Sequence, residues 1–204
     1  MTFTWAESVR AFEDAAESYV ATTALVGDRW EQPGLGEWSV RDLVGHTSRS
    51  FITVETYLRQ TPEKVEITSA ADYIRATRAI AAGPDVAQRG RDAGAALGGD
   101  PVAAVVELAA RVRPLVAACD GTELLTTLVG GMRLADYLPT RTFELAVYTA
   151  DLAVALGEPV AVPAHAAAQA LAIVSDVAVA DGTAGTLLLQ ATGRPLPAGY
   201  SVMA

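Results

Sequence analysis

Four long segments of this chain repeat apolar residues every three or four positions, the period at which one face of an α-helix is buried. In the second segment, Val40, Leu43 and Val44 begin a stripe that continues through Phe51 and Val54. Capping signals stand before three of the segments, at Thr4–Glu7, Ser39–Asp42 and Asp100–Pro101. The pattern predicts long helices over about 5–26, 40–59, 101–119 and 134–156, and therefore a mainly α fold, an antiparallel four-helix bundle.

Shorter elements are predicted between and after these helices. We expect a short helix over 69–82, a short helix with a loop over the Gly- and Ala-rich residues 85–99, and a strand or extended loop over 121–132. A further helix over 163–180 precedes Thr186–Ala191 and Gly199–Met203, which predict two short strands and a small C-terminal β-hairpin. The chain divides into a bundle, 1–160, and a small extension of helix and hairpin, 161–204.

The net charge and the number of cysteines disfavour several classes of protein. A formal net charge of −9 disfavours binding to nucleic acid or to an anionic membrane surface, because both require a basic footprint. The single cysteine, Cys119, leaves no partner for an internal disulfide, and the first ten residues lack the pattern of a signal peptide. We therefore expect a cytoplasmic protein, a monomer or homodimer, that acts on a small molecule or thiol.

Two stretches carry side chains that could form a site. His46 lies at the edge of the apolar stripe of the second predicted helix, and Glu144 and Tyr148 share one face of the fourth at i and i+4. Each stretch also has a simpler structural interpretation. His46 could be a hydrogen-bonded core histidine, and Arg141 with Glu144 could be an ordinary i,i+3 ion pair on a polar face.

These stretches resemble those of a known family. Trp30, Pro33, Gly34 and Gly36, followed by EWSVRDLVGH, resemble the amino-terminal signature of the mycothiol-dependent maleylpyruvate isomerase family. That family belongs to the DinB/YfiT-like metal-binding four-helix bundles. Residues 141–157 resemble its second signature, and ATGRPLPAGYSV resembles the carboxyl end of such proteins. The resemblance thus spans most of the chain.

The resemblance implies a zinc or other divalent metal site and a thiol cofactor of the mycothiol type. The metal ligands would fall on His46, on Glu144 and on a third position that is Tyr148 here, where the family has histidine. A neutral phenol is a poor zinc ligand near pH 7, so the sequence predicts weak zinc binding. Tyr148 then becomes a candidate for hydrogen bonding or acid–base work, and Arg194 for a clamp on a substrate carboxylate.

Three functions follow from these observations. The first is a mycothiol-dependent isomerase or S-transferase with an altered metal site. The second is a metal-free bundle that binds a small molecule and uses Tyr148 in place of the ligand. The third is an interaction protein without chemistry.

Overall fold

The long helices begin at the capping residues that precede them. The hydroxyl of Thr4 accepts a hydrogen bond from the backbone N–H of Glu7, and the hydroxyl of Ser39 accepts one from the backbone N–H of Asp42. In return, the carboxylates of Glu7 and Asp42 accept hydrogen bonds from the backbone N–H groups of Thr4 and Ser39. Each reciprocal pair satisfies two backbone donors that a helix start leaves free. In the computed structural model, which describes residues 3–81, 83, 85–195 and 201–202, the predicted long helices are α1 (Trp5–Ala24), α2 (Val40–Tyr57), α5 (Pro101–Ala117) and α6 (Leu134–Leu156).

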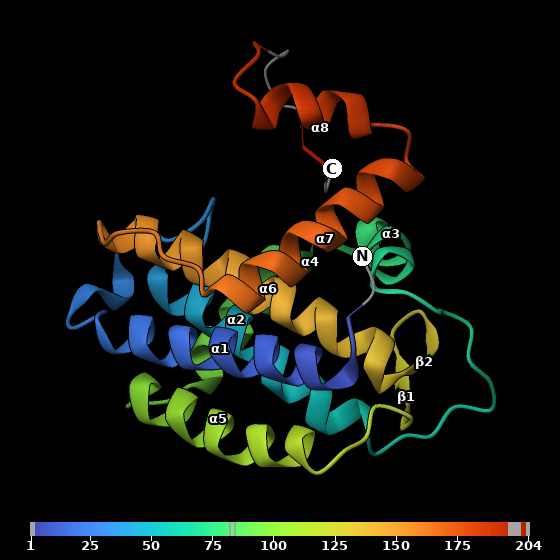
Figure 1. Cartoon of the computed structure of the whole chain (residues 1–204). Helices are drawn as coiled ribbons and strands as arrows, with labels where there is room; N and C mark the ends of the chain where they lie inside the picture. The colour runs from blue at the N-terminus through green and yellow to red at the C-terminus, as the bar shows by residue number, and fades with distance from the viewer. Residues whose placement is uncertain (1–2, 82, 84, 196–200, 203–204) are drawn as a thin grey trace.

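These four helices form the bundle, and the mainly helical class is confirmed (Figure 1). Contacts at the helix ends give their directions. The indole N–H of Trp5 donates to the carbonyl of Cys119, so α1 and α5 are antiparallel, whereas Arg29 after α1 donates to the carbonyl of Leu156 at the end of α6, so α1 and α6 are parallel. The helices run up, down, down and up, with the long crossover between α2 and α5.

The crossover holds two further helices, α3 (Ala70–Ala81) and α4 (Asp85–Ala96). Helix α4 confirms the short helix predicted within residues 85–99. In the structure the glycines let α4 lie directly on α2. A Cβ atom built at Gly45 would stand 2.2 Å from the backbone nitrogen of Gly94, and one at Gly90 would stand 2.3 Å from the indole of Trp38. The two helices therefore meet backbone to backbone.

A small antiparallel hairpin is present, but not at the predicted place. Strands β1 (Leu124–Thr127) and β2 (Gly130–Arg133) pair between α5 and α6, within the segment predicted as strand or extended loop. The predicted strand at Thr186–Ala191 is wrong, since these residues lie in helix α8 (Ala184–Ala191). A tail strand needs a partner for its backbone groups, whereas a helix pairs them locally. The other predicted strand, Gly199–Met203, falls outside the described residues except for 201 and 202.

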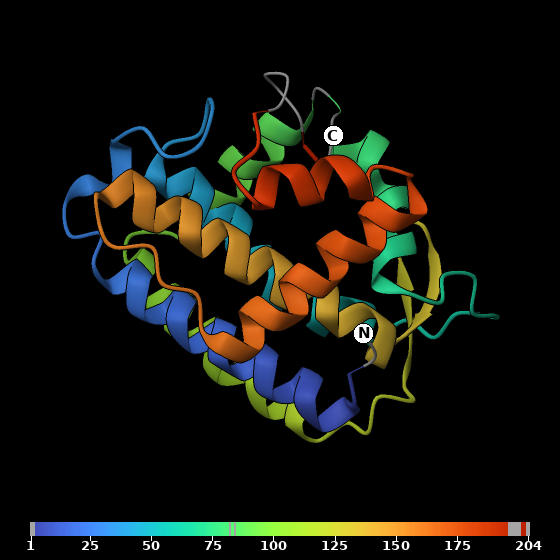
Figure 2. The same cartoon turned by 45° about the horizontal axis from the view of Figure 1, so that its top comes forward.

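The C-terminal extension packs back on the bundle. Helix α7 (Ala164–Ala180) contacts α1, α3 and α6, and Figure 2 shows it leaning across α6 toward α3. Asp181 after α7 accepts hydrogen bonds of 2.7 Å from both Arg75 and Arg78 of α3. The proposed division at residue 160 falls in the connection between α6 and α7 and stays a prediction.

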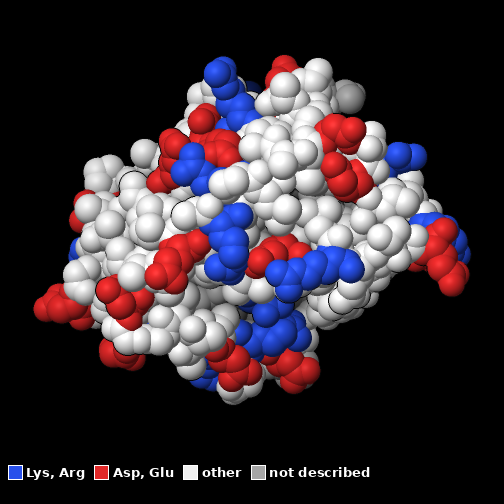
Figure 3. Space-filling view, turned by 90° about the horizontal axis from the view of Figure 1, so that it is seen from below, with Lys and Arg blue, Asp and Glu red and all other residues white. Residues whose placement is uncertain are grey.

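The face in Figure 3 mixes both signs of charge, with basic and acidic side chains alternating across it. Charged side chains of the bundle also pair between helices: Arg113 of α5 pairs with Glu13 and Glu17 of α1, and Arg111 pairs with Glu55 of α2. Within the described part of the chain, no single helix is long and apolar enough to cross a membrane. Only α4 and α5 taken together pass such a test, and they are bent by 94°.

The Gly45 contact gives a stability prediction. Gly45→Ala should lower the free energy of unfolding by about 2 kcal/mol, because the new methyl group meets the backbone of α4 and forces the helices apart. Urea denaturation followed by circular dichroism measures this change. Gly185→Ala in α8 is the control, since nothing lies within 4 Å of its Cβ position. Equal stability of Gly45→Ala and wild type would contradict the close packing.

Candidate functional site

His46 is held between two aromatic rings. It lies on α2, and its ring centroid is 4.5 Å from that of Trp38 and 4.9 Å from that of Tyr148 on α6. Trp38 is itself fixed, because its indole N–H donates to the carbonyl of Ala87 on α4 at 3.1 Å. The structure therefore brings two of the sequence-predicted site residues, His46 and Tyr148, into direct contact.

The environment keeps the His46 imidazole neutral. Burial, with smaller contributions from Arg49, Arg141 and Arg89, lowers its pKa to about 4, although Glu144 opposes this shift. The Nδ1 atom of His46 is buried and has no hydrogen-bond partner among the described residues. Because buried polar atoms are nearly always paired in proteins, this atom marks a place for a water molecule or a ligand.

Glu144 is tied to a buried arginine one turn earlier on α6. The two Nη atoms of Arg141 donate to the two carboxylate oxygens of Glu144, at 2.9 and 3.0 Å. The hydroxyl of Ser50 on α2 lies 3.5 Å from the same carboxylate. The ordinary i,i+3 pair considered from the sequence does form, but it is not on a solvated face, because the Arg141 side chain is only 4% exposed.

Tyrosine rings line the other side of the Arg141 guanidinium. Its Cζ atom lies 4.8 Å from the ring centroid of Tyr137 and 5.6 Å from that of Tyr73 on α3. Cation–π contacts of this kind help to compensate a buried cation for lost water. The pKa values of both tyrosines are raised, chiefly by burial, so they are neutral. The arrangement fixes both Arg141 and its partner Glu144.

Tyr148 stands beside this pair as a neutral phenol. Burial raises its pKa, and the nearby carboxylates of Glu144 and Asp151 raise it further. A neutral phenol can donate a hydrogen bond to an anionic atom or give up a proton during a reaction.

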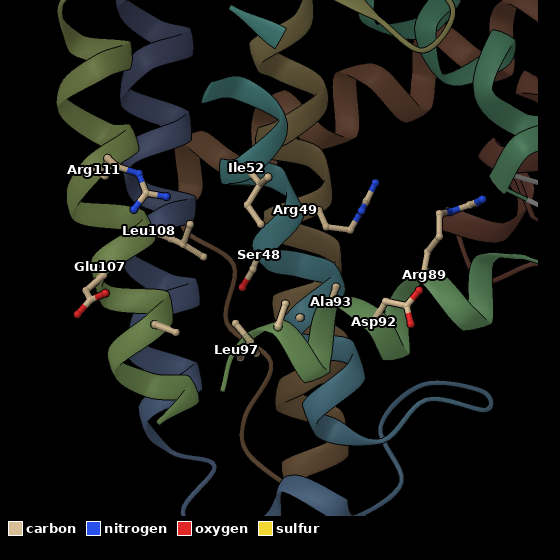
Figure 4. Close-up of a pocket in the computed structure, with 13 residues that line it drawn as sticks. Ser48, Arg49, Ile52, Arg89, Asp92, Ala93, Leu97, Glu107, Leu108 and Arg111 are labelled. Carbon is tan, nitrogen blue, oxygen red and sulfur yellow. The ribbon is translucent and has the colours of Figure 1, made fainter. Parts of the chain in front are cut away.

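Two further arginines lie close to His46. Arg49 of α2 is half-buried, and its guanidinium has no ion-pair or hydrogen-bond partner within the described ranges, while the guanidinium of Arg89 of α4 donates to the carbonyl of Ile80. Both line a cavity of about 510 Å³ between α2, α4 and α5, and Figure 4 shows the two side chains extending toward the same side of it. Arg49 is thus a free cation at the edge of the site.

Other sequence candidates lie apart from this group. Arg194 is exposed after α8, and its guanidinium donates to the carbonyl of Thr192, so its described contacts do not join it to His46. His165 is exposed and lies 2.8 Å from Asp14. Burial and nearby Glu123 raise the pKa of Cys119 to about 11, which keeps the thiol protonated at neutral pH.

The sequence analysis did not identify Trp38 and Arg49 as site residues. A signal was present for Arg49, because residues at i and i+3 of a helix share a face and Arg49 follows His46 at that spacing. Nothing in the sequence pattern placed Trp38 on the imidazole.

The described residues give a poor donor set for zinc. A catalytic zinc site needs three protein ligands, and His46 is the only imidazole in this group. Both oxygens of Glu144 already accept hydrogen bonds from Arg141, and Tyr148 has a raised pKa that opposes its ionisation. No group of three or more His, Cys, Asp or Glu side chains stands ready for a metal within the described ranges. These residues do not fit a resident zinc ion.

Zinc content tests this assessment. Protein purified without a histidine tag should contain well below one zinc per chain, and Tyr148→His should raise that content by restoring a second imidazole. Plasma emission spectrometry measures the metal, and Tyr148→Phe is the matched control. Near-stoichiometric zinc in the wild type that disappears in Tyr148→Phe would show that the phenolate is a ligand.

The depressed pKa of His46 makes stability depend on pH. The unfolded chain binds a proton at an ordinary histidine pKa near 6.5, whereas the folded chain binds it only near 4. Stability is therefore lost as pH falls from about 6.5 toward 4, by roughly 3 kcal/mol from this residue. His46→Gln should flatten the wild-type curve in that window, measured by urea denaturation at several pH values. His165→Gln is the control, and an unchanged slope in His46→Gln would contradict the pKa.

Comparison with known proteins identifies the family. A family model described as the mycothiol maleylpyruvate isomerase N-terminal domain matches residues 9–153, which include every helix that builds the His46 site. No curated protein and no solved structure matches the chain. Because the matched region covers well over half of the 204 residues, the chain belongs to the mycothiol maleylpyruvate isomerase N-terminal domain family.

Proposed function

We propose that this protein is a mycothiol-dependent-type enzyme, an isomerase or S-transferase, that acts on a small anionic electrophile at His46 without relying on zinc. The observation that carries the proposal is the buried, unpartnered Nδ1 atom of His46, in contact with a neutral Tyr148 and within the field of three arginines. Membership of the family supports the reaction class, because the matching model is named for mycothiol and for maleylpyruvate isomerase.

The charges near His46 favour an anionic substrate. Arg49, Arg89 and Arg141 bring three positive charges, whereas Glu144 and, beside Tyr148, Asp151 bring two negative charges. The whole chain has a formal net charge of −9, so this site is locally opposite in sign to the protein. A site of that kind attracts carboxylates and disfavours cations.

Each side chain has a role in this proposal. A bound thiol supplies the nucleophile that attacks the electrophile. The neutral imidazole of His46 accepts a hydrogen bond from the thiol or takes its proton, and the phenol of Tyr148 donates one toward negative charge that develops on the substrate. Arg49 binds a substrate carboxylate. This is the role for which the sequence had suggested Arg194. Trp38 lies against the imidazole and holds its ring in position.

A second candidate is a protein that binds such molecules without turning them over. The observation in its favour is that Arg141 occupies both oxygens of Glu144, so that carboxylate is not available as a base. Tyr148 would then act as a hydrogen-bond donor to the bound molecule.

Turnover and binding together test the proposal. Wild type should isomerise maleylpyruvate only when mycothiol is present, and His46→Gln and Tyr148→Phe should each lower the rate by about 100-fold. Absorbance spectroscopy follows the reaction. Arg49→Gln should raise KM about tenfold, since a hydrogen bond to a charged group is lost. Arg91→Gln, on the exposed side of α4, is the control.

Binding measurements separate the two candidates. A rise in melting temperature with maleylpyruvate that Arg49→Gln removes, without any thiol-dependent turnover, would support the binding protein instead. The absence of both turnover and a melting shift would contradict the proposed site.

A further inference from the structure

A second cavity lies where the C-terminal extension meets the bundle. Its volume is about 310 Å³, and its walls come from the start of α1, the segment before α3, the start of α6 and helix α7. The residues that line it are Phe3, Ser8, Thr68, Ser69, Ala70, Ala135, Asp136, Pro139, Gln169, Ala172, Ile173 and Asp176. None of them belongs to the group around His46, so the cavity is independent of the proposed function.

A buried glutamine in this wall lacks half of its hydrogen bonds. Gln169 of α7 is 0% exposed. Its Nε2 atom donates to the hydroxyl of Ser8 at 3.0 Å, but its carbonyl oxygen Oε1 is buried and has no partner among the described residues. A buried amide oxygen without a donor is costly, so this atom marks a place for a donor that the chain does not supply.

The charges of the cavity are negative. Asp136 of α6 is half-buried, Asp176 of α7 is exposed, and neither has a hydrogen bond or an ion pair within the described ranges. No lysine or arginine is among the described lining residues. Burial raises the pKa of Asp136, although the positive charge of Arg133 partly opposes that rise. The cavity therefore presents acceptors and negative charge to whatever enters it.

The apolar residues of the cavity wall further restrict the class of ligand that the cavity can bind. Phe3, Pro139 and Ile173 give the cavity a hydrocarbon surface, which suits an alkyl chain and not the full oxygen shell that magnesium or calcium requires. The aromatic ring of Phe3 also favours a neighbouring cation. A small organic cation with N–H donors and a short chain matches all of these features.

We infer that this cavity is a binding site for a primary alkylammonium ion. The ammonium group donates hydrogen bonds to Oε1 of Gln169 and to the carboxylate of Asp136, and the alkyl chain lies against Pro139 and Ile173. Because the walls come from both the bundle and α7, occupancy of the cavity holds the extension against the bundle.

Calorimetric titration of the full chain with n-butylammonium chloride, at fixed ionic strength, tests the inference. Saturable binding at one site per chain is expected, and Asp136→Asn should weaken it about tenfold, because a charge-assisted hydrogen bond is lost. Glu107→Gln is the matched control, since it removes the same charge from an exposed position outside this cavity. Tetramethylammonium, which has no N–H donor, should bind far more weakly.

Several results would overturn the inference. They are the absence of saturable heat, equal binding of n-butylammonium and tetramethylammonium, and equal losses in Asp136→Asn and Glu107→Gln, which would reduce the effect to general charge attraction. Gln169→Leu should also weaken binding. If circular dichroism shows that Gln169→Leu does not fold, the comparison of Asp136→Asn with Glu107→Gln is sufficient to test the inference.

Discussion

The ion pair between Arg141 and Glu144 is the interaction on which the surrounding structure depends. A guanidinium that is almost fully buried must be paired and hydrogen-bonded, because an uncompensated buried charge destabilises a fold by several kcal/mol. Here the two oxygens of Glu144 satisfy it on one side, and the rings of Tyr73 and Tyr137 on the other. Since Tyr73 belongs to α3, the same pair also fixes part of the crossover against α6.

This pair also sets the electrostatics of His46. Glu144 is engaged with Arg141, so it only partly offsets the arginines around the imidazole, and burial keeps the ring neutral. The close approach of α4 to α2 adds to the effect, because it brings Arg89 near and anchors Trp38 over the ring. An acidic protein thereby gains a locally positive, aromatic-walled site, which suits an anion better than it suits a metal ion.

The helices of the bundle could be predicted from the sequence because their causes are local. Thr4 and Ser39 cap helices through residues three positions away, and the apolar stripes follow the helical period. The prediction of a C-terminal strand was wrong because its cause would not have been local. Residues 186–191 are compatible with either structure on local grounds, and only the presence or absence of a partner strand decides between them. The short helix predicted within 85–99 is present as α4, but the contact of its glycines with Gly45 could not be predicted because it forms between two helices.

By itself, the sequence determined the helical class, the starts and approximate ends of the long helices, and the family resemblance. Each of these depends on residue identity and on spacing along one helix. Only the tertiary structure decided that Glu144 is bound to Arg141, that Trp38 lies against His46, and that the Arg49 side chain has no partner among the residues described. These features arise between α2, α4 and α6, and burial and neighbouring charge, which set protonation and free hydrogen-bonding capacity, exist only once those helices pack.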